Sequence, residues 1–208
     1  MNDIASTAIF GAATQDALAG TRVVEFCQIA AGPFCGMLLA DQGADVVKVE
    51  APGGDGMRQW PPLTGGFSEN FASLNRNKRS IVLDLKNADD RAAAHALCLG
   101  ADVVVENFRP GVMQRLGLAY ADLAAEAPSL VYCSISAYGQ EGPRAQEGGF
   151  DVTLQAVGGV MSVTGEAGGA PVKCGVPLTD FTAGLYAAFG IASALHAVRA
   201  GGPGRYID

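Results

Sequence analysis

The chain has 208 residues, of which 49% are hydrophobic, and a formal net charge of −7 at pH 7. This length and apolar content suffice for a buried core in one large or two small domains. Because a nucleic-acid surface normally needs a basic patch, the acidic balance argues against a nucleic-acid partner.

The N-terminal part of the sequence predicts neither a membrane segment nor a targeting segment. No hydrophobic run reaches the length of a membrane span, and residues 1–17 contain Asp3 and Asp16 but no basic stretch. We therefore expect a flexible lead-in over residues 1–17, a folded domain from Leu18 onward, no membrane partner, and a cytoplasmic protein.

Cysteine and histidine are placed in a way that argues against metal or triad chemistry. The five cysteines are scattered without any Cys-x-x-C pair, and only His95 and His196 are present. Neither histidine has an acidic or cysteine neighbour at ligand spacing. We expect buried structural cysteines, no metal site and no Ser-His-Asp triad.

The first predicted unit is a strand, a tight turn, a helix and a second strand. Val23 to Phe26 is a short run of β-branched and aromatic residues that predicts a strand buried on both faces. Gly32 and Pro33 open the helix, Gly43 closes it, and residues 44–50 predict the second strand. The start of such a helix is an anion site, yet the spacing lacks the glycine patterns of dinucleotide and P-loop proteins.

A segment rich in glycine and proline follows, and regular elements resume after it. Residues 51–66 predict a long loop before a strand that contains Ile81. The later elements are expected as a strand over 79–86, a helix over 89–99, a strand over 101–108, short helices over 113–116 and 120–126, a strand over 130–136, a helix over 151–157, an apolar buried helix over 182–199 and the start of a strand within 201–208.

This alternation of strands and helices predicts an α/β fold with a doubly wound parallel sheet. Ligands of such sheets gather at the carboxyl ends of the strands. In this sequence the turns over residues 28–32, 107–109 and 136–139 fall at those ends.

Cationic residues near the predicted strand ends have two interpretations. The chain has only 14 lysines and arginines, and Lys78, Arg79, Lys86 and Arg115 stand near strand ends. They either hold phosphate groups of a bulky anionic ligand or are solvated surface charges. Spacing alone favours the surface interpretation.

Two aspartates stand where helices are predicted to begin. Asp180 is either an N-cap of the apolar helix or a nucleophile, since a helix N-terminus would keep the carboxylate ionised and stabilise an oxyanion. Asp151 also opens a helix, and capping is its expected role. A second carboxylate near Asp180 would help to orient a substrate, but the sequence does not bring the two together.

Several motifs stand in a fixed order along residues 18–208. They are Leu18-x-Gly20-x-Arg22-Val-Val-Glu-Phe26, Ala31-Gly-Pro33, Leu39-Ala-Asp-x-Gly-Ala-Asp-Val-Val-Lys-Val-Glu50, Asn75-x-Asn-Lys-Arg-Ser80, Leu83-Asp-Leu-Lys86, Asp102-Val-Val-Val-Glu-Asn-Phe-Arg-Pro-Gly111, Gly139-x-x-Gly-Pro143 and Asp180 with Gly184. Together they resemble the N-terminal portion of the family III CoA-transferases, the CaiB/BaiF type that includes formyl-CoA transferase and carnitine CoA-transferase.

The resemblance implies a fold, an assembly and a set of ligands. Residues 18–208 would form the large, Rossmann-like, CoA-binding domain, truncated before the small domain of the family. The full-length form would be a homodimer of interlocked, ring-shaped subunits. Its substrates would be an acyl-CoA and a small carboxylic acid, with coenzyme A as the carrier and no metal.

The resemblance also implies roles for individual residues. Asp180 matches the catalytic aspartate, which attacks the acyl-CoA thioester to form a mixed anhydride before CoA and the acceptor acid exchange through an enzyme-bound thioester. Asp151 is a candidate on the substrate side. Positions that line the CoA site match Gln28, Ile29, Ala30, Ala31, Leu83, Lys86, Asn107, Phe108 and Arg115.

Three alternatives remain open at the level of sequence. The first is a CoA-binding or dimerisation fragment without turnover. The second is an enzyme like the α-methylacyl-CoA racemases, although Phe150 stands where those enzymes have a histidine and two-base proton transfer would lack a partner. The third, a nucleotide-dependent oxidoreductase, rests on the alternating pattern alone.

Overall fold

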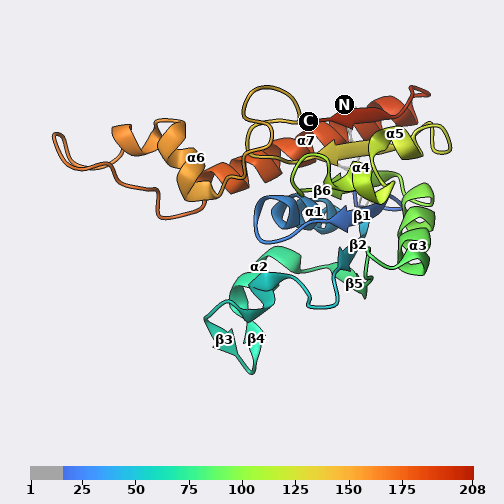
Figure 1. The fold of residues 1–208 in the computed structure, drawn as a ribbon, viewed down its shortest axis with the longest axis horizontal. Coiled ribbons are helices and arrows are strands. Elements are labelled where there is room, and N and C mark those ends of the chain that lie inside the picture. Colours follow the sequence, from blue (N-terminus) through green and yellow to red (C-terminus); the bar gives the residue numbers. More distant parts are fainter. Residues whose placement is uncertain (1–15) are drawn as a thin grey trace, which may run out of the picture.

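A computed structural model describes residues 16–208 and shows a parallel sheet with helices on both faces (Figure 1). The predicted lead-in over residues 1–17 lies almost entirely outside the described residues. The 6-stranded sheet has the order β5-β2-β1-β6-β7-β8, and each neighbouring pair is parallel. This is the strand order of a Rossmann fold, so the predicted fold class is confirmed.

The strands of this sheet are short and rich in valine, which favours extended, buried backbone. Their bounds are Arg22–Phe26 for β1, Asp45–Glu50 for β2, Lys78–Val82 for β5, Val103–Glu106 for β6, Val131–Ser134 for β7 and Arg205–Ile207 for β8.

The helices connect these strands, apart from a small unit that projects beyond β5. Their bounds are Ala31–Asp41 for α1, Glu69–Asn75 for α2, Ala88–Leu99 for α3, Val112–Leu116 for α4, Tyr120–Leu123 for α5, Asp151–Val157 for α6 and Leu178–Arg199 for α7. Single 3-10 turns cover Gly56–Gln59 (η2) and Val160–Val163 (η3), and the strands β3 (Leu63–Thr64) and β4 (Phe67–Ser68) form a separate hairpin.

The sheet separates two hydrophobic cores, because successive residues of a strand point to opposite faces. Val23 belongs to a cluster with residues of α1 and α7, whereas Val24 belongs to a cluster with residues of α3, α4 and α5. Helices therefore cover both faces, as a doubly wound sheet requires.

The cysteines mostly belong to these cores. Cys27, Cys35, Cys98 and Cys133 are buried, as predicted, while Cys174 is only half-buried. Within residues 16–208 there is no group of three or more His, Cys, Asp or Glu side chains that could hold a metal ion.

The segment between β2 and β5 is not the long loop that its composition predicts. It contains η2, the β3–β4 hairpin and α2. Ser68 begins α2, because its hydroxyl accepts a hydrogen bond from the Phe71 N–H at 3.2 Å and so caps the helix. The strand predicted over 79–86 ends at Val82, which places Lys86 in the turn before α3 instead of at a strand end.

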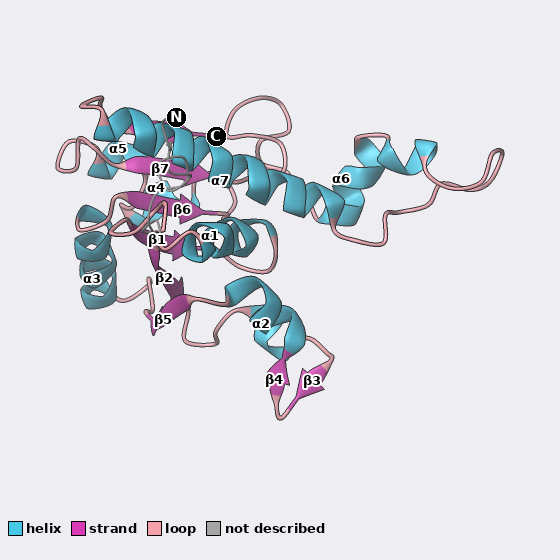
Figure 2. Ribbon diagram, turned by 180° about the vertical axis from the view of Figure 1, so that it is seen from behind, coloured by secondary structure: helices cyan, strands magenta, loops and turns pink. Residues whose placement is uncertain are grey.

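Helix α7 is longer and less buried than predicted. It begins at Leu178 instead of residue 182, and Tyr186 and Phe189 are 70% and 69% exposed. Judged by length and composition alone, Leu178–Arg199 is long and apolar enough to cross a membrane, and 33% of the 18-residue stretch that meets this criterion is buried. By this criterion, the prediction that no hydrophobic run reaches the length of a membrane span is wrong. Figure 2 shows α7 extending past the sheet toward α6, which projects from the body.

Candidate functional site

The centre of the site is the point where the strand order reverses, between β1 and β6. Ligand crevices of open α/β sheets form at such points. The turns that follow the two strands are joined in both directions: the Gln28 N–H donates to Asn107 Oδ1 at 2.9 Å, and Asn107 Nδ2 donates to the Gln28 carbonyl at 2.9 Å. This pairing fixes the turn after β1 against the end of β6.

The next residue of that turn has an unusual backbone. Ile29 has a φ of 66°, in the left-handed region that β-branched residues rarely adopt. Its N–H donates to the Asp55 carboxylate, with distances of 3.3 Å to Oδ1 and 3.2 Å to Oδ2. The turn is thus held by an amide on one side and a carboxylate on the other.

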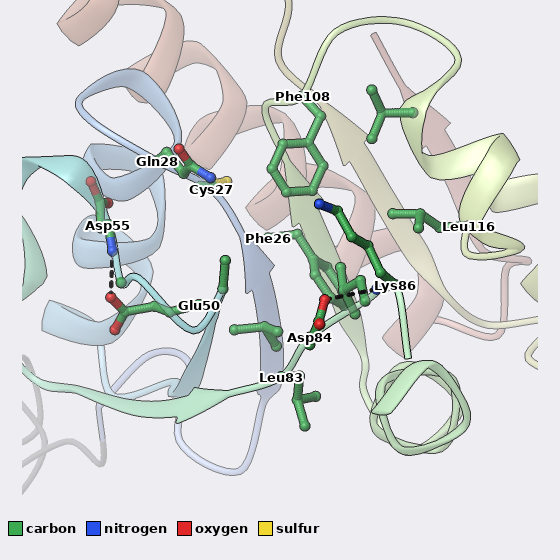
Figure 3. A pocket seen from close by; sticks show the side chains of 15 residues that line it. Phe26, Cys27, Gln28, Glu50, Asp55, Leu83, Asp84, Lys86, Phe108 and Leu116 are labelled. Atoms are coloured by element: carbon green, nitrogen blue, oxygen red, sulfur yellow. Dashed lines mark hydrogen bonds between the residues drawn. The ribbon is translucent and has the colours of Figure 1, made fainter. Parts of the chain in front are cut away.

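A first hollow opens beside this turn, and we call it the outer hollow. Four residues of the predicted CoA set line it, namely Gln28, Leu83, Lys86 and Phe108. Figure 3 shows the Lys86 side chain extending toward Phe108 across the opening. Its remaining walls are largely apolar, with Glu50 and Asp55 at the side nearest β2. An apolar hollow with an ammonium at its rim suits a ligand with a flat, apolar body and anionic groups.

A second hollow contains Asp180, and we call it the aspartate hollow. It is lined by Ala31, Asn107 and Phe108 of the predicted CoA set, together with Asp180 at the start of α7. Phe108 lines both hollows, so they adjoin at this residue. A ligand that fills the outer hollow can therefore extend past Phe108 to the Asp180 carboxylate.

The two aspartates predicted to cap their own helices do something different. The N-cap of α7 is Pro177 and that of α6 is Phe150, so Asp180 and Asp151 both lie in first turns. Asp151 instead caps α7: its Oδ1 accepts from the Thr179 N–H at 2.8 Å and from the Asp180 N–H at 3.4 Å. The fold thus brings together two carboxylates that the sequence left apart.

A buried glutamine holds Asp151 in this position. Gln155 is 0% exposed and donates to Asp151 Oδ2 at 2.6 Å, while its own Oε1 accepts from the Cys174 N–H at 2.7 Å. The Thr179 hydroxyl donates to Asp151 Oδ1 at 2.8 Å. Asp151 is therefore fixed between α6 and the start of α7.

The environment of Asp180 makes its carboxyl group more basic than usual. Burial, and then the negative charge of Asp151, raise the pKa of Asp180 to about 6. The sequence predicts that the helix N-terminus keeps this carboxylate ionised, and the raised pKa weakens that effect without removing it. With that pKa the group is still ionised in about nine molecules of ten at pH 7.

Three residues of the predicted CoA set lie outside both hollows. Ile29 and Ala30 pack into a small apolar cluster with Met57 and Leu74. Arg115 is an exposed side chain on α4 and is not part of the lining of either hollow.

The other cations near the strand ends are engaged with carboxylates. Arg79 is exposed and pairs with Asp45 at 2.6 Å, as the surface interpretation predicts. Lys78 is buried, with a side chain 2% exposed, and pairs with Glu25 at 2.8 Å.

Sequence reasoning missed this buried charged group, although a signal for it exists. Glu25 and Lys48 are directly opposite each other in the parallel register of β1 and β2. Opposite charges at matched positions of two strands that are otherwise apolar indicate a buried ion pair, and Asp55 and Lys78 complete the group.

Comparisons with known proteins identify the family to which the chain belongs. The profile of CoA-transferase family III matches residues 18–208. A succinate–glutarate CoA-transferase of Agrobacterium fabrum is 44% identical over 200 residues, which are 92% of this chain and 50% of that protein. The succinyl-CoA:glutarate CoA-transferase of Homo sapiens is 42% identical over 193 residues, covering 92% of this chain and 44% of that protein.

A solved structure shows the same fold. A CaiB/BaiF family protein from Brucella suis superposes with a TM-score of 0.89 at 42% identity, covering 94% of this chain and 53% of that one. The chain thus spans about half the length of the curated relatives that it matches.

Proposed function

The chain belongs to CoA-transferase family III, and we propose on this basis that the protein containing it transfers CoA from an acyl-CoA thioester to a carboxylic acid through Asp180. The observation that carries the proposal is that Asp180 lies in a hollow that adjoins, at Phe108, the hollow lined by Gln28 and Lys86. One extended ligand can therefore occupy both hollows.

We place CoA with its nucleotide end in the outer hollow and its thioester toward Asp180. The apolar lining accommodates the adenine ring, and the Lys86 ammonium neutralises phosphate oxygens. The turn from Gln28 to Ala31 lies along the path, since Gln28 lines one hollow and Ala31 the other. This arrangement brings the reacting carbonyl to a fixed carboxylate, which makes the first step effectively intramolecular.

The chemistry proceeds by exchange at three carbonyl carbons, which belong to the donor acyl group, to Asp180 and to the acceptor acid. An oxygen of Asp180 bonds to the acyl carbon while the carbon–sulfur bond breaks, leaving CoA thiolate and a mixed anhydride. The thiolate then attacks the Asp180 carbonyl carbon, which releases the donor acid and leaves an aspartyl-CoA thioester. The acceptor carboxylate attacks that thioester, and the released thiolate takes the acceptor acyl group, regenerating Asp180.

The surroundings of Asp180 favour this nucleophilic role. Its raised pKa leaves it largely ionised at neutral pH and more basic than a solvated aspartate. Partial burial limits access of water, which would hydrolyse the anhydride and the thioester. Because the two relatives named above carry succinate or succinyl-CoA and glutarate in their names, we propose short dicarboxylic acids as substrates.

We also propose that the complete protein is a homodimer. The surface formed by α6 and the first half of α7 exposes large apolar side chains, including Phe150, Tyr186 and Phe189, at 70%, 70% and 69%. Large exposed apolar side chains on neighbouring helices are typical of a protein interface.

Substitution of Asp180 tests the proposed function. Asp180→Ala in the complete protein should abolish label exchange between succinyl-CoA and free glutarate, because no carboxylate remains to accept the acyl group. CoA binding, measured by calorimetry, should persist because the outer hollow is unchanged. Glu166→Ala, which removes an exposed carboxylate outside both hollows, is the control and should exchange like the wild type.

The same assay separates the proposal from its alternatives. Undiminished exchange in Asp180→Ala would contradict the nucleophilic role of Asp180. CoA binding by the wild-type complete protein without any exchange would instead favour a binding protein without turnover.

A further inference from the structure

A group of charged side chains is buried beside the turn after β1 and takes no part in the chemistry proposed above. Lys48 Nζ lies 3.1 Å from Glu25 Oε1 and 3.0 Å from Asp55 Oδ2, and it donates to the Cys27 carbonyl at 2.7 Å. The side chains of Lys48, Glu25 and Asp55 are at most 1% exposed. Lys78 lies 2.8 Å from the other Glu25 oxygen, so the charges of the group balance.

Such a group is seldom a source of net stability, because desolvation of the charges offsets their attraction. Burial by itself would lower the pKa of Lys48, but the adjacent carboxylates of Glu25 and Asp55 outweigh burial and raise it. The ammonium is therefore charged, and its contacts fix the orientation of the Asp55 carboxylate. Because the Asp55 carboxylate is fixed, the backbone N–H groups that donate to it are held in place as well.

Asp55 uses that orientation to hold backbone N–H groups. Its carboxylate accepts from the Ile29 N–H at 3.2 Å and from the Met57 N–H at 2.9 Å. Its own N–H donates to Glu50 Oε2 at 2.9 Å, which fixes the backbone of Asp55. Asp55 thus bridges the turn after β1 and the chain after β2.

The Ile29 contact matters because the backbone there is strained. A φ of 66° is unfavourable for isoleucine, so the turn holds this shape only when surrounding groups impose it. Gln28, directly before Ile29, lines the outer hollow, and Ala31, two residues after Ile29 at the start of α1, lines the aspartate hollow. Relaxation at Ile29 would therefore move a wall of each hollow.

We infer that Asp55, oriented by Lys48, is a positioning residue for CoA, because it holds Ile29 in the left-handed conformation that shapes the turn between the two hollows. This inference rests on the proposed function. It assigns a role in ligand binding to charges that neither line the reacting centre nor contact Asp180.

Two matched substitutions test the inference in the complete protein. Asp55→Asn and Glu25→Gln each remove one negative charge from the same buried group at almost constant volume, but only Asp55 contacts the Ile29 N–H. Asp55→Asn should weaken binding of free CoA by about tenfold or more and raise KM for the acyl-CoA more than it lowers kcat. Glu25→Gln should lower Tm while leaving the Kd for CoA within about twofold of the wild type.

Two results would overturn this role. An unchanged Kd in both Asp55→Asn and Asp55→Ala, the second of which removes every side-chain acceptor for the Ile29 N–H, would show that the contact does not shape the site. Equal weakening by Glu25→Gln would show that general loss of stability, and not the Ile29 contact, lowers affinity. If the wild type itself fails to bind CoA, the proposed function fails and the inference fails with it, whereas an unchanged Kd in both Asp55 variants removes the inference alone.

A measurement on the wild type keeps the test independent of whether Asp55→Asn folds. The Ile29 amide should exchange its hydrogen slowly in the ligand-free protein, because its acceptor is the buried Asp55 carboxylate and not the ligand. Exchange of that amide at the rate of an unstructured peptide would overturn the inference.

Discussion

At Asp180 the fold destabilises the ionised form of a single side chain, and this suits the nucleophilic role that we propose for it. No side-chain hydrogen bond to its carboxylate is found within residues 16–208, and Asp151 adds a second negative charge nearby. The carboxylate is therefore less stable here than in water. A nucleophile benefits from this situation, because its basicity rises while it stays largely ionised at pH 7.

Because the ionised Asp180 carboxylate destabilises the folded protein, Asp180→Asn should raise the free energy of unfolding, and the gain should depend on pH. The folded pKa, about 6, lies above the ordinary value of 3.8, so the stabilising contribution of the protonated group is fully present below pH 3.8 and is lost as pH rises through 6. After a discount for partial exposure to solvent, the variant should be more stable than the wild type by about 1–2 kcal/mol at pH 7.5.

Urea denaturation at pH 4 and at pH 7.5 measures this difference. The two proteins should have nearly equal unfolding free energies at pH 4. A variant that is equally or less stable than the wild type at pH 7.5 would show that the Asp180 carboxylate is not destabilised in the folded protein.

Individual residues could be predicted only where a local pattern marks them. Gln28 closely follows a predicted strand, and Asn107 and Phe108 stand at the end of the strand predicted over 101–108, so the sheet topology places them at the ligand edge without knowledge of their contacts. The link between Asp151 and Asp180 could not be predicted, because it depends on how α6 meets the start of α7. Asp55 was missed because it stands in a segment whose composition indicates only a loop.

At the scale of elements, the close packing of α7 on α1 depends on one glycine. A Cβ at Gly184 would lie 2.5 Å from the Ala31 carbonyl oxygen and 3.0 Å from the Phe34 ring. The rings of Phe34 and Phe181 stack beside this contact with centroids 4.7 Å apart. Since Asp180 lies one turn earlier on α7, this packing also sets its distance from the turn after β1.

Substitution of two glycines in the same helix tests this packing. Gly184→Ala should destabilise the protein by about 1–3 kcal/mol, because the methyl group meets backbone that cannot move freely. Gly190→Ala is the control: its Cβ would lie 3.6 Å from Ile207, an ordinary contact, so better helix propensity should stabilise the protein by up to about 1 kcal/mol. Equal effects on Tm would contradict the close contact at Gly184.

The elements that could be predicted are those whose pattern is long and regular. The helix after β5 and the strands with valine runs lie where the hydrophobic periodicity of the sequence predicts them. The strand over 79–86 is shorter than predicted because Asp84 ends it: the Asp84 carboxylate accepts from the Lys86 N–H at 3.0 Å and forms a turn. Helix α2 was missed because its seven residues give too short a pattern, although Ser68 offered a capping signal.

At the scale of the whole molecule, the alternation of strands and helices was enough to predict a doubly wound parallel sheet, and the family resemblance implied the Rossmann-like fold. Parallel connections are nearly always right-handed, so few arrangements of these elements are possible. Helix α6 was predicted over 151–157, but its projection from the body was not, because its exposed apolar side chains look in sequence like those of a core. The two hollows meet at Phe108 only as a result of the complete sheet.

The most direct test of the central claim is to trap the covalent intermediate. The complete protein is incubated with succinyl-CoA and glutarate and quenched with hydroxylamine, which converts an anhydride or thioester of a carboxylate into a hydroxamate, and the peptides are then sequenced by mass spectrometry. We expect an acyl-CoA-dependent hydroxamate on Asp180 that is absent from Asp180→Asn. A hydroxamate on another carboxylate such as Asp151, or none while CoA transfer proceeds, would contradict the nucleophilic role of Asp180.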